Sequence, residues 1–403
     1  MNYLKIHKGY IKDRLEFSLK VIFVFCIIYD IQTVQLGGIT SARIASFLIL
    51  SYIILFKGFS IDRQLLKFIG LCFLLICVSV VQALYSGDST QVARLSYFTV
   101  YSILISYYFS KFISNQLELY WIFLVACSIQ SIILLVSFFN ISFKATLASY
   151  IAYGGNFEAE KNIYRAFGLS STTGAALSLI QSIGVITSIL IIKTYDVNKK
   201  KVVAFIIGFI CFCSTLFVGR TGVVVSMFMY MLLLFSSKAV NILKYLPLSG
   251  IVLFVMYEVL SIESFFEGID NFSTEYFFNW VSNAFSIQEN RTVDALDDMK
   301  IPPVTYETIV GTGQIIASNG SNASGHDSGY IHAYYSLGLF FSFIFYISLF
   351  LYTIKLWDRK SFFVLVLVLI MFLVEYKEPF IFKYAFPFYL LTILNFQNRR
   401  MTL

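Results

Sequence analysis

Charged side chains are scarce in this chain of 403 residues. Only 13% of the residues are Asp, Glu, Lys or Arg, whereas soluble globular domains carry about 25%. Hydrophobic residues make up 58% of the chain, and its mean hydropathy is +0.77. This balance excludes an ordinary soluble globular protein. Short segments of alternating polarity are also lacking, which excludes a transmembrane β-barrel.

Cysteine and histidine do not occur where they would build a metal site or a disulfide framework. There are six cysteines and three histidines, and every cysteine lies within an apolar segment rather than in a loop. We therefore predict no disulfide framework, no metal site and no other cofactor. The net charge of +7 comes from short basic clusters between apolar segments rather than from one basic face, so nucleic acid is not an expected partner.

Long apolar segments fill most of the chain instead. They are of the length with which a helix crosses the hydrocarbon core of a bilayer, about 17–25 residues, and they are apolar on all sides. This pattern predicts an all-α, polytopic membrane protein in which residues 1–403 form a single membrane domain. The predicted spans, about twelve in number, are roughly 17–36, 39–57, 66–85, 92–112, 117–140, 170–192, 201–218, 221–237, 242–262, 329–354, 361–375 and 378–396.

The distribution of basic residues predicts the orientation of these spans. An even number of spans places both termini on one side, and most of the 30 Lys and Arg residues fall in segments on that side. By the positive-inside rule that side is the cytoplasm. The basic segment Lys5–Lys20 and the apolar run after it are similar to a signal peptide. Asp30 interrupts the run and no cleavage site follows, so we predict a retained first span.

Two segments between spans are expected on the outer face. They comprise residues 141–169 and residues 263–328, and the second is the longest hydrophilic stretch of the chain. Long loops in compact proteins are usually functional, and apolar patches in both segments predict that they fold back onto the helices. Within the second segment Arg291 is a candidate substrate-binding residue. The acids around it either bind a divalent cation or, as we favour, form the solvated face of a surface helix.

Three arginines near the outer face are candidate ligands of a diphosphate. Gly219-Arg220-Thr221-Gly222 separates two apolar segments, which places Arg220 at the membrane surface, where a guanidinium must snorkel, pair or line a polar cavity. It is either a snorkelling side chain in a tight turn or a phosphate ligand beside the start of the next helix. Arg165 precedes the Ser/Thr-rich helix start at residues 170–173 and is expected to meet Arg220. Arg94, near the outer end of the fourth span, is the third candidate.

A second group of polar residues lies where the large outer segment meets the tenth span. His326 and His332 are two of the three histidines, and Asp327 directly follows the first. A histidine at a polar–apolar boundary suits general-base chemistry near neutral pH. The alternative is that His326 and Asp327 cap the N-terminus of the span. Tyr330 and Tyr334 at the mouth of the span either bind sugars or belong to an interfacial aromatic belt.

Several of these features together resemble a family of membrane glycosyltransferases. Gly311-Thr312-Gly313, the later His326-Asp327 and Gly338-Leu339 inside a predicted span resemble the region shared by O-antigen polymerases (Wzy) and O-antigen ligases. Gly219-Arg220-Thr221-Gly222 between two spans resembles a feature common in the polymerases. The number of spans and the outer segments before the sixth and tenth spans are similar to the layout of the family.

The resemblance implies a GT-C-like fold and a multi-pass enzyme of the bacterial inner membrane that needs no cofactor. A polymerase of this kind works at the periplasmic face in lipopolysaccharide biosynthesis. It transfers a glycan chain from undecaprenyl diphosphate onto a new lipid-linked repeat unit, with a chain-length regulator as a candidate partner. On this hypothesis Arg220 and Arg165 stabilise the leaving diphosphate. His326 is the general base, with Asp327 as its orienter or as the base itself, and Arg220 and His326 face one outer cavity.

Two other functions compete with this hypothesis. An O-antigen ligase, which joins finished glycan to the lipid A core, shares the His326 region, although the turn at Arg220 favours the polymerase. A flippase for lipid-linked oligosaccharides is the alternative from another class. Transporters carry polar residues near the middle of the membrane and broken helices, whereas the charges of this chain gather near the predicted outer face, with Asp30 and Glu258 as exceptions.

Overall fold

The computed structural model describes helices and their connections over most of the chain. The regular secondary structure of the described part is entirely helical, with a few isolated β-bridges such as Gln32 with Thr40. This confirms the all-α class. The predicted span 242–262 lies outside the described residues, which are 2–58, 60–153, 165–195, 197–236, 299–318, 320–359 and 361–402.

Several helices have the length and composition of membrane helices. Within the described ranges, four are long and apolar enough to cross a bilayer: Arg63–Ser86, Gln116–Phe139, Gly174–Thr194 and Leu339–Leu356. Three shorter helices are also apolar: Ser41–Phe56, Arg220–Leu233 and Phe362–Glu375. The chain thus has the character of a helical membrane protein. The number of twelve spans, the GT-C likeness and the orientation stay predictions.

The chain divides into two compact units. Unit 1 comprises Met1–Ala45 and Asn115–Ser286, and unit 2 comprises Ser46–Ser114 and Ile287–Leu403. The first boundary between the units, after Ala45, falls within helix α2 (Ser41–Tyr52). This helix continues as the π-helical segment η2 (Ile53–Lys57).

In unit 1, α8 is the central helix. It is buried along most of its length and packs against α6, α9 and α10. Both α6 and α9 pack closely against α8 at Gly184, which has no side chain. A Cβ atom there would come within 2.8 Å of Cys127 on α6 and 2.6 Å of Cys211 on α9. Small residues commonly allow such close packing of membrane helices. The described helices of this unit are α1 (Asn2–Tyr29), η1 (Val34–Leu36), α6 (Gln116–Phe139), α7 (Ile141–Tyr150), α8 (Gly174–Thr194), α9 (Asn198–Leu216) and α10 (Arg220–Ser236).

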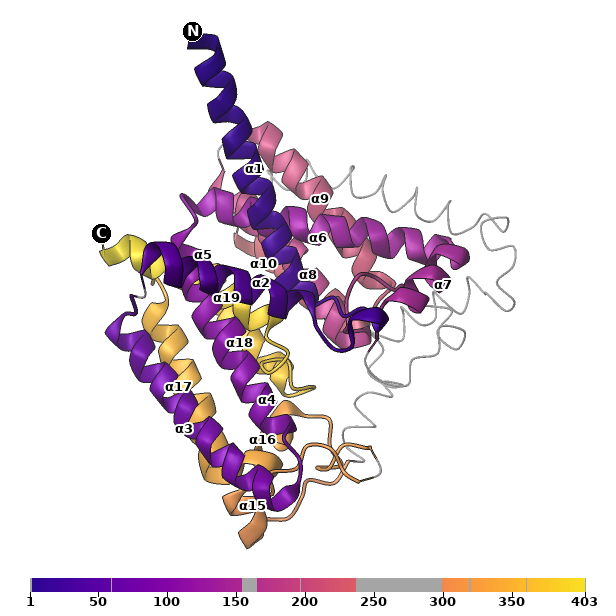
Figure 1. The fold of residues 1–403 in the computed structure, drawn as a ribbon. Helices are drawn as coiled ribbons and strands as arrows, with labels where there is room; N and C mark the ends of the chain where they lie inside the picture. Colours follow the sequence, from indigo (N-terminus) through magenta and orange to yellow (C-terminus); the bar gives the residue numbers. More distant parts are fainter. Residues whose placement is uncertain are drawn as a thin grey trace. The chain divides into compact units, whose positions relative to one another are not determined.

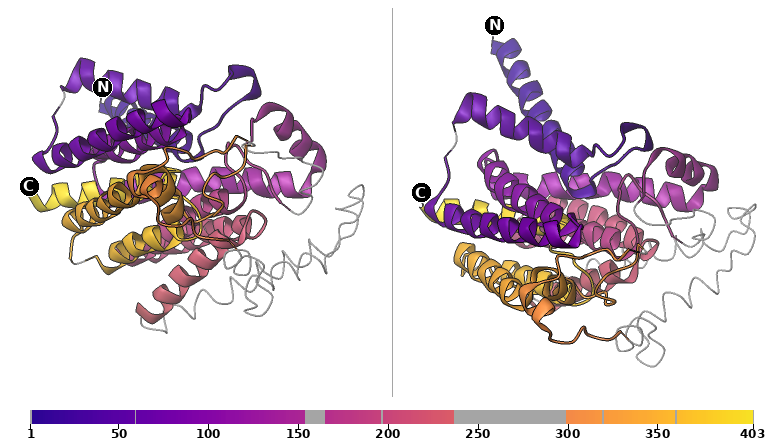
Figure 2. Two further views of the ribbon diagram at one scale, coloured as in Figure 1. Left: turned by 90° about the horizontal axis from the view of Figure 1, so that it is seen from below. Right: turned by 60° about the horizontal axis from the view of Figure 1, so that its bottom comes forward.

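In unit 2, α3 and α17 run side by side (Figure 1), and the rings of Phe68 and Tyr352 stack between them with centroids 4.5 Å apart. The orange to yellow helices α17 and α18 also lie together in both views of Figure 2. The described helices of this unit are α3 (Arg63–Ser86), the continuous run of α4 (Thr90–Tyr97), η3 (Phe98–Ile105) and α5 (Ser106–Lys111), then α15 (Tyr306–Val310), α16 (Gly329–Leu337), α17 (Leu339–Leu356), α18 (Phe362–Glu375) and α19 (Ala385–Thr402).

The predicted tenth span, 329–354, is not one helix. The chain breaks at Gly338, whose φ of 98° lies in a region that glycine adopts readily. The hydroxyl of Tyr346 donates to the carbonyl oxygen of Gly329 at 3.2 Å, whereas a continuous helix would separate these two residues by about 25 Å. The short helix α16 therefore folds back along α17, and the prediction of a single span here was wrong.

Candidate functional site

The N-terminal ends of α8 and α10 meet in unit 1 because glycines remove the side chains between them. A Cβ atom on Gly222 would overlap the carbonyl oxygen of Ser178, and one on Gly219 would lie 3.0 Å from the carbonyl group of Gly174. The amide of Gly222 donates to the Ser178 hydroxyl at 3.0 Å. The glycines of the Gly-Arg-Thr-Gly sequence thus serve the close packing of the two helices.

This packing brings the side chain of Arg165 and the first residue of α10, Arg220, to the neighbourhood of Gly174. Nη1 of Arg165 lies 3.5 Å from the position that a Cβ atom would take on Gly174, the first residue of α8. Arg220 is the first residue of α10 and follows Gly219, which contacts Gly174. The segments before the two helices are also joined, since the amide of Ala166 donates to the Phe217 carbonyl oxygen at 2.7 Å. Arg165 is exposed and Arg220 is half-buried.

Two helix N-termini add to the positive potential of these arginines. Each N-terminus carries partial positive charge from its amide groups, and together they favour an anion. Thr173 is the N-cap residue of α8 but makes no side-chain capping bond. The Ser170 hydroxyl instead lies 2.9 Å from that of Thr172. The predicted helix start was therefore correct, and its hydroxyl groups bond to one another rather than to the first amides of α8.

His326 lies in unit 2, in the connection between α15 and α16. Its side chain is buried, and its Nδ1 accepts a hydrogen bond of 3.0 Å from the amide of Ser328. In the neutral ring this bond assigns the proton to Nε2. Neither ring nitrogen is then a free proton acceptor. A general-base role for His326 would need a different tautomer.

Asp327 is exposed, and among the described residues no hydrogen bond joins it to His326. The predicted role of Asp327 as an orienter of His326 is therefore not supported by a hydrogen bond between the two side chains. The N-cap of α16 is Ser328, so the alternative that His326 and Asp327 cap this helix was wrong.

Asp88 anchors the connection that carries His326. Its carboxylate accepts from the amides of Ile315 at 2.7 Å and Ile316 at 2.9 Å, and from the amide and hydroxyl of Thr90. Burial alone would raise the pKa of this group, but the bonds from Thr90, Ile316 and Ile315 outweigh it and lower the pKa of Asp88 to about 2. Sequence reasoning missed Asp88, although its position just before a helix start was a signal.

The Gly-x-Gly sequence packs against Gln82 and the end of α16. Nε2 of Gln82 donates to the carbonyl oxygens of Val310 at 2.8 Å and Leu337 at 3.1 Å. A Cβ atom on Gly311 would overlap Gln82 and Leu337, and one on Gly313 would lie 2.9 Å from Gln82. These glycines therefore allow backbone contact, and the bonds satisfy the last carbonyl groups of α15 and α16.

Arg94 belongs to unit 2, whereas Arg165 and Arg220 belong to unit 1. Its Nη1 is 3.5 Å from Nδ1 of His332 on α16. The prediction that Arg220 and His326 face one cavity concerns residues of different units and stays a prediction. Arg291 and most of the predicted outer segment 263–328 lie outside the described residues.

Tyr330 and Tyr334 make internal contacts. The hydroxyl of Tyr330 donates to the Phe372 carbonyl oxygen at 2.7 Å, and its ring packs on that of Tyr346. Tyr334 is buried, and its hydroxyl donates to Thr308 Oγ1 at 3.0 Å. Tyr334 thus offers no open ring face to a sugar, and the role of Tyr330 in sugar binding stays a prediction.

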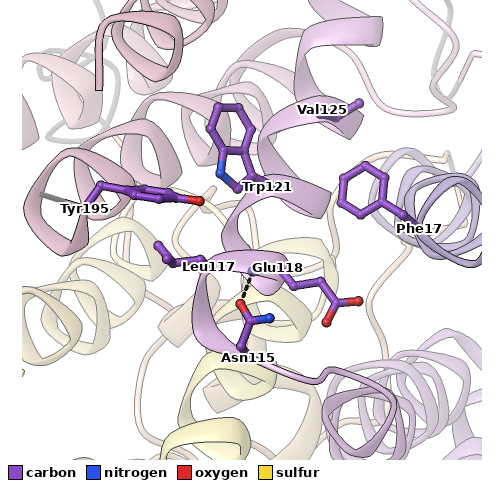
Figure 3. Close-up of a pocket in the computed structure, with 7 residues that line it drawn as sticks. All are labelled: Phe17, Asn115, Leu117, Glu118, Trp121, Val125 and Tyr195. Carbon is purple, nitrogen blue, oxygen red and sulfur yellow. Dashed lines mark hydrogen bonds between the residues drawn. The ribbon is translucent and has the colours of Figure 1, made fainter. Parts of the chain in front are cut away.

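A hollow in unit 1 lies at the other end of α8. It has a volume of about 430 Å³ and is lined mainly by Trp121, Phe17 and Tyr195, together with Asn115, Leu117, Glu118 and Val125 (Figure 3). Tyr195 follows the last residue of α8, about 30 Å along the helix from Gly174. This hollow is therefore distinct from the arginine pair. Within the described ranges no three His, Cys, Asp or Glu side chains are grouped as metal ligands.

Comparisons with known proteins give no match: no protein-family model, no curated protein and no solved structure is significantly similar to the chain.

Proposed function

We propose that the protein is a surface-polysaccharide polymerase that transfers a glycan chain from undecaprenyl diphosphate onto a lipid-linked repeat unit. The observation that carries the proposal is the packing of the N-terminal ends of α8 and α10 at Gly174, which Nη1 of Arg165 approaches and which Gly219, the residue before Arg220, contacts. Two guanidinium groups and two helix N-termini form a site suited to a diphosphate, because planar guanidinium groups bind phosphate oxygens in pairs.

In the proposed reaction, a sugar hydroxyl of the acceptor attacks the anomeric carbon of the donor glycan. A carbon–oxygen bond forms there, and the bond from the anomeric carbon to the phosphate oxygen breaks. The leaving diphosphate takes the bonding electrons, so negative charge grows on its oxygens in the transition state. Arg165 and Arg220 stabilise this charge, which is typically the largest single contribution of such a site.

The proton of the attacking hydroxyl goes to a base, for which Asp327 is the first candidate. Its carboxylate is exposed and can accept the proton directly. His326 is the second candidate, because its Nδ1 is already occupied by the amide of Ser328. Asp327→Asn is therefore expected to reduce polymer synthesis more than His326→Gln does.

Polymer length in a strain that lacks the gene tests the proposal. We expect the strain to carry single repeat units on the lipid A core, and the unaltered gene to restore the ladder of long chains. Arg220→Ala and Arg165→Ala should each lower the rate of polymerisation about 10²–10³-fold. Arg220→Lys should retain part of the activity, since it keeps a charge but not the planar fork. Arg14→Ala, an exposed residue on α1 beside Phe17, is the matched control.

A normal ladder from Arg220→Ala protein at unaltered membrane levels would refute the proposal. A bare core in the deletion strain would indicate a ligase. Lipid-linked repeats held on the cytoplasmic face would indicate a flippase. Either of these two outcomes would replace the polymerase.

A further inference from the structure

The ring of His332 in unit 2 lies between two hydrogen-bond donors. Nδ2 of Asn322 is 2.7 Å from Nε2 of the ring, and Nη1 of Arg94 is 3.5 Å from Nδ1. A neutral imidazole has one acceptor nitrogen and one N–H group. The ring therefore accepts from only one of these neighbours.

The orientation of the Asn322 amide is fixed by its other partners. Oδ1 accepts from the amide of Ser324 at 3.2 Å and from its hydroxyl at 3.0 Å, while Nδ2 donates to the carbonyl oxygen of His326 at 2.5 Å. A flipped amide would place oxygen against oxygen at His326 and N–H against N–H at Ser324. Asn322 is thus a donor toward His332.

It follows that Nε2 of His332 accepts from Asn322 and that the ring proton is on Nδ1. The 2.7 Å separation is that of a full hydrogen bond, whereas 3.5 Å is at the outer limit. The Nδ1–H group of His332 and a guanidinium N–H of Arg94 then lie side by side, and neither accepts a hydrogen bond from the other. Among the described residues, neither group has a hydrogen-bond acceptor at this point.

No carboxylate of the described residues forms an ion pair with Arg94. The carboxyl groups that act on Arg94 electrostatically are those of the buried Glu375 and of Asp88. The oxygens of Glu375 already accept from the Tyr346 hydroxyl at 2.8 Å and from the amide of Ile381 at 2.7 Å. Arg94 is half-buried, and none of its N–H groups is among the buried polar atoms that lack a hydrogen-bond partner. A guanidinium in such surroundings favours an anionic ligand.

We propose that Arg94 and His332 form an oxyanion site in unit 2, in which one oxygen of a phosphate or carboxylate group accepts from Arg94 and from Nδ1–H of His332. Asn322 is the positioning residue that holds the ring in this tautomer. The assignment of the ligand to a glycan substrate rests on the proposed function, as a phosphate of the lipid carrier or a carboxylate of an acidic sugar. The binding of an oxyanion does not depend on glycosyl transfer.

The full-length protein in lipid nanodiscs, labelled with ¹⁵N-histidine, gives a direct test by NMR. Only His7, His326 and His332 contribute signals, so two single substitutions assign the spectrum. We expect Nδ1–H for His332 and Nε2–H for His326. Inorganic pyrophosphate and glucuronate are then titrated separately. A saturable shift of the His332 Nδ1 signal with pyrophosphate assigns a phosphate, and a shift with glucuronate alone assigns a carboxylate.

Arg94→Gln should weaken the response of His332 about tenfold or more, while the exposed Arg63→Gln on α3 should leave it unchanged. The His326 signal reports whether each variant is folded. If Arg94→Gln does not fold, Arg94→Lys replaces it and should weaken the response through loss of the planar fork. The proposal is overturned by an Nε2–H tautomer of His332, by no response to either anion, or by an equal response in the Arg94 variant. Normal ladders from Arg220→Ala would instead refute the proposed function and leave this site standing.

Discussion

The arginine pair of unit 1 and the histidine connection of unit 2 are held in place by different means. At the arginine pair, Gly219 and Gly222 let two long helices touch, and the contacts are mostly backbone to backbone. The connection before α16 has no long helix of its own. The side chains of Asp88 and Asn322 bind its backbone groups, and Gln82 binds the last carbonyl groups of α15 and α16. A site on packed helices is fixed by shape, whereas a site on a connection depends on a few polar anchors.

The largest effect is expected at the helix contact of unit 1. Gly222→Ala would place a methyl group against the Ser178 carbonyl oxygen, and we expect a loss of about 3 kcal/mol in stability together with loss of polymer synthesis. Gly70→Ala on α3 is the matched control, because a Cβ atom there meets nothing within 4 Å. Thermal unfolding in nanodiscs measures both. Equal melting temperatures for the two variants would show that the glycine contact is not what holds α8 and α10.

A smaller effect is expected from Gln82→Leu in unit 2. The carbonyl groups of Val310 and Leu337 would lose their donor, at a cost of about 2 kcal/mol. The change should be local, so that amide exchange accelerates in residues 310–313 and not in α8. Gln64→Leu, at an exposed position of the same helix, serves as the control. Uniform acceleration across both units would contradict the view that this anchor is local.

The smallest effect is expected from Asp88→Asn, which weakens the bonds to the amides of Ile315 and Ile316 by about 1 kcal/mol. Because the pKa of Asp88 is lowered in the folded state, to about 2, its contribution is complete above the ordinary carboxyl pKa of about 4 and is lost as the pH falls toward 2. Hydrogen exchange at these two amides measures the effect, with Asp13→Asn as the control. Unchanged protection would show that the carboxylate does not anchor the connection.

The sequence predicted the helical class and the membrane character because both follow from the lengths and composition of the apolar segments. It also placed Arg165 ahead of one helix start and Arg220 at another, and the structure brings these two helix starts together at Gly174. A contact between the two guanidinium groups stays a prediction. The fold-back of α16 was not predictable in the same way. Hydropathy does not distinguish a helix that continues from 329 to 354 from two helices that reverse at Gly338.

The polar anchors were missed for a related reason. Asp88 and Gln82 lie more than two hundred residues along the chain from the backbone groups of residues 310–316 that they bind. The residues next to Asp88 and Gln82 in the sequence do not predict such distant contacts. His332 was noticed only as a neighbour of His326. Its pairing with Arg94 depends on the way α16 packs in unit 2, which spacing along the chain does not reveal.

The most direct measurement is glycosyl transfer by the purified protein. Lipid-linked repeat units extracted from the deletion strain are incubated with the protein in nanodiscs, and the products are resolved by mass. We expect lipid-linked products of two or more repeats together with free undecaprenyl diphosphate, and neither product with Arg220→Ala. Unaltered single repeats after incubation with the folded, unsubstituted protein would contradict it.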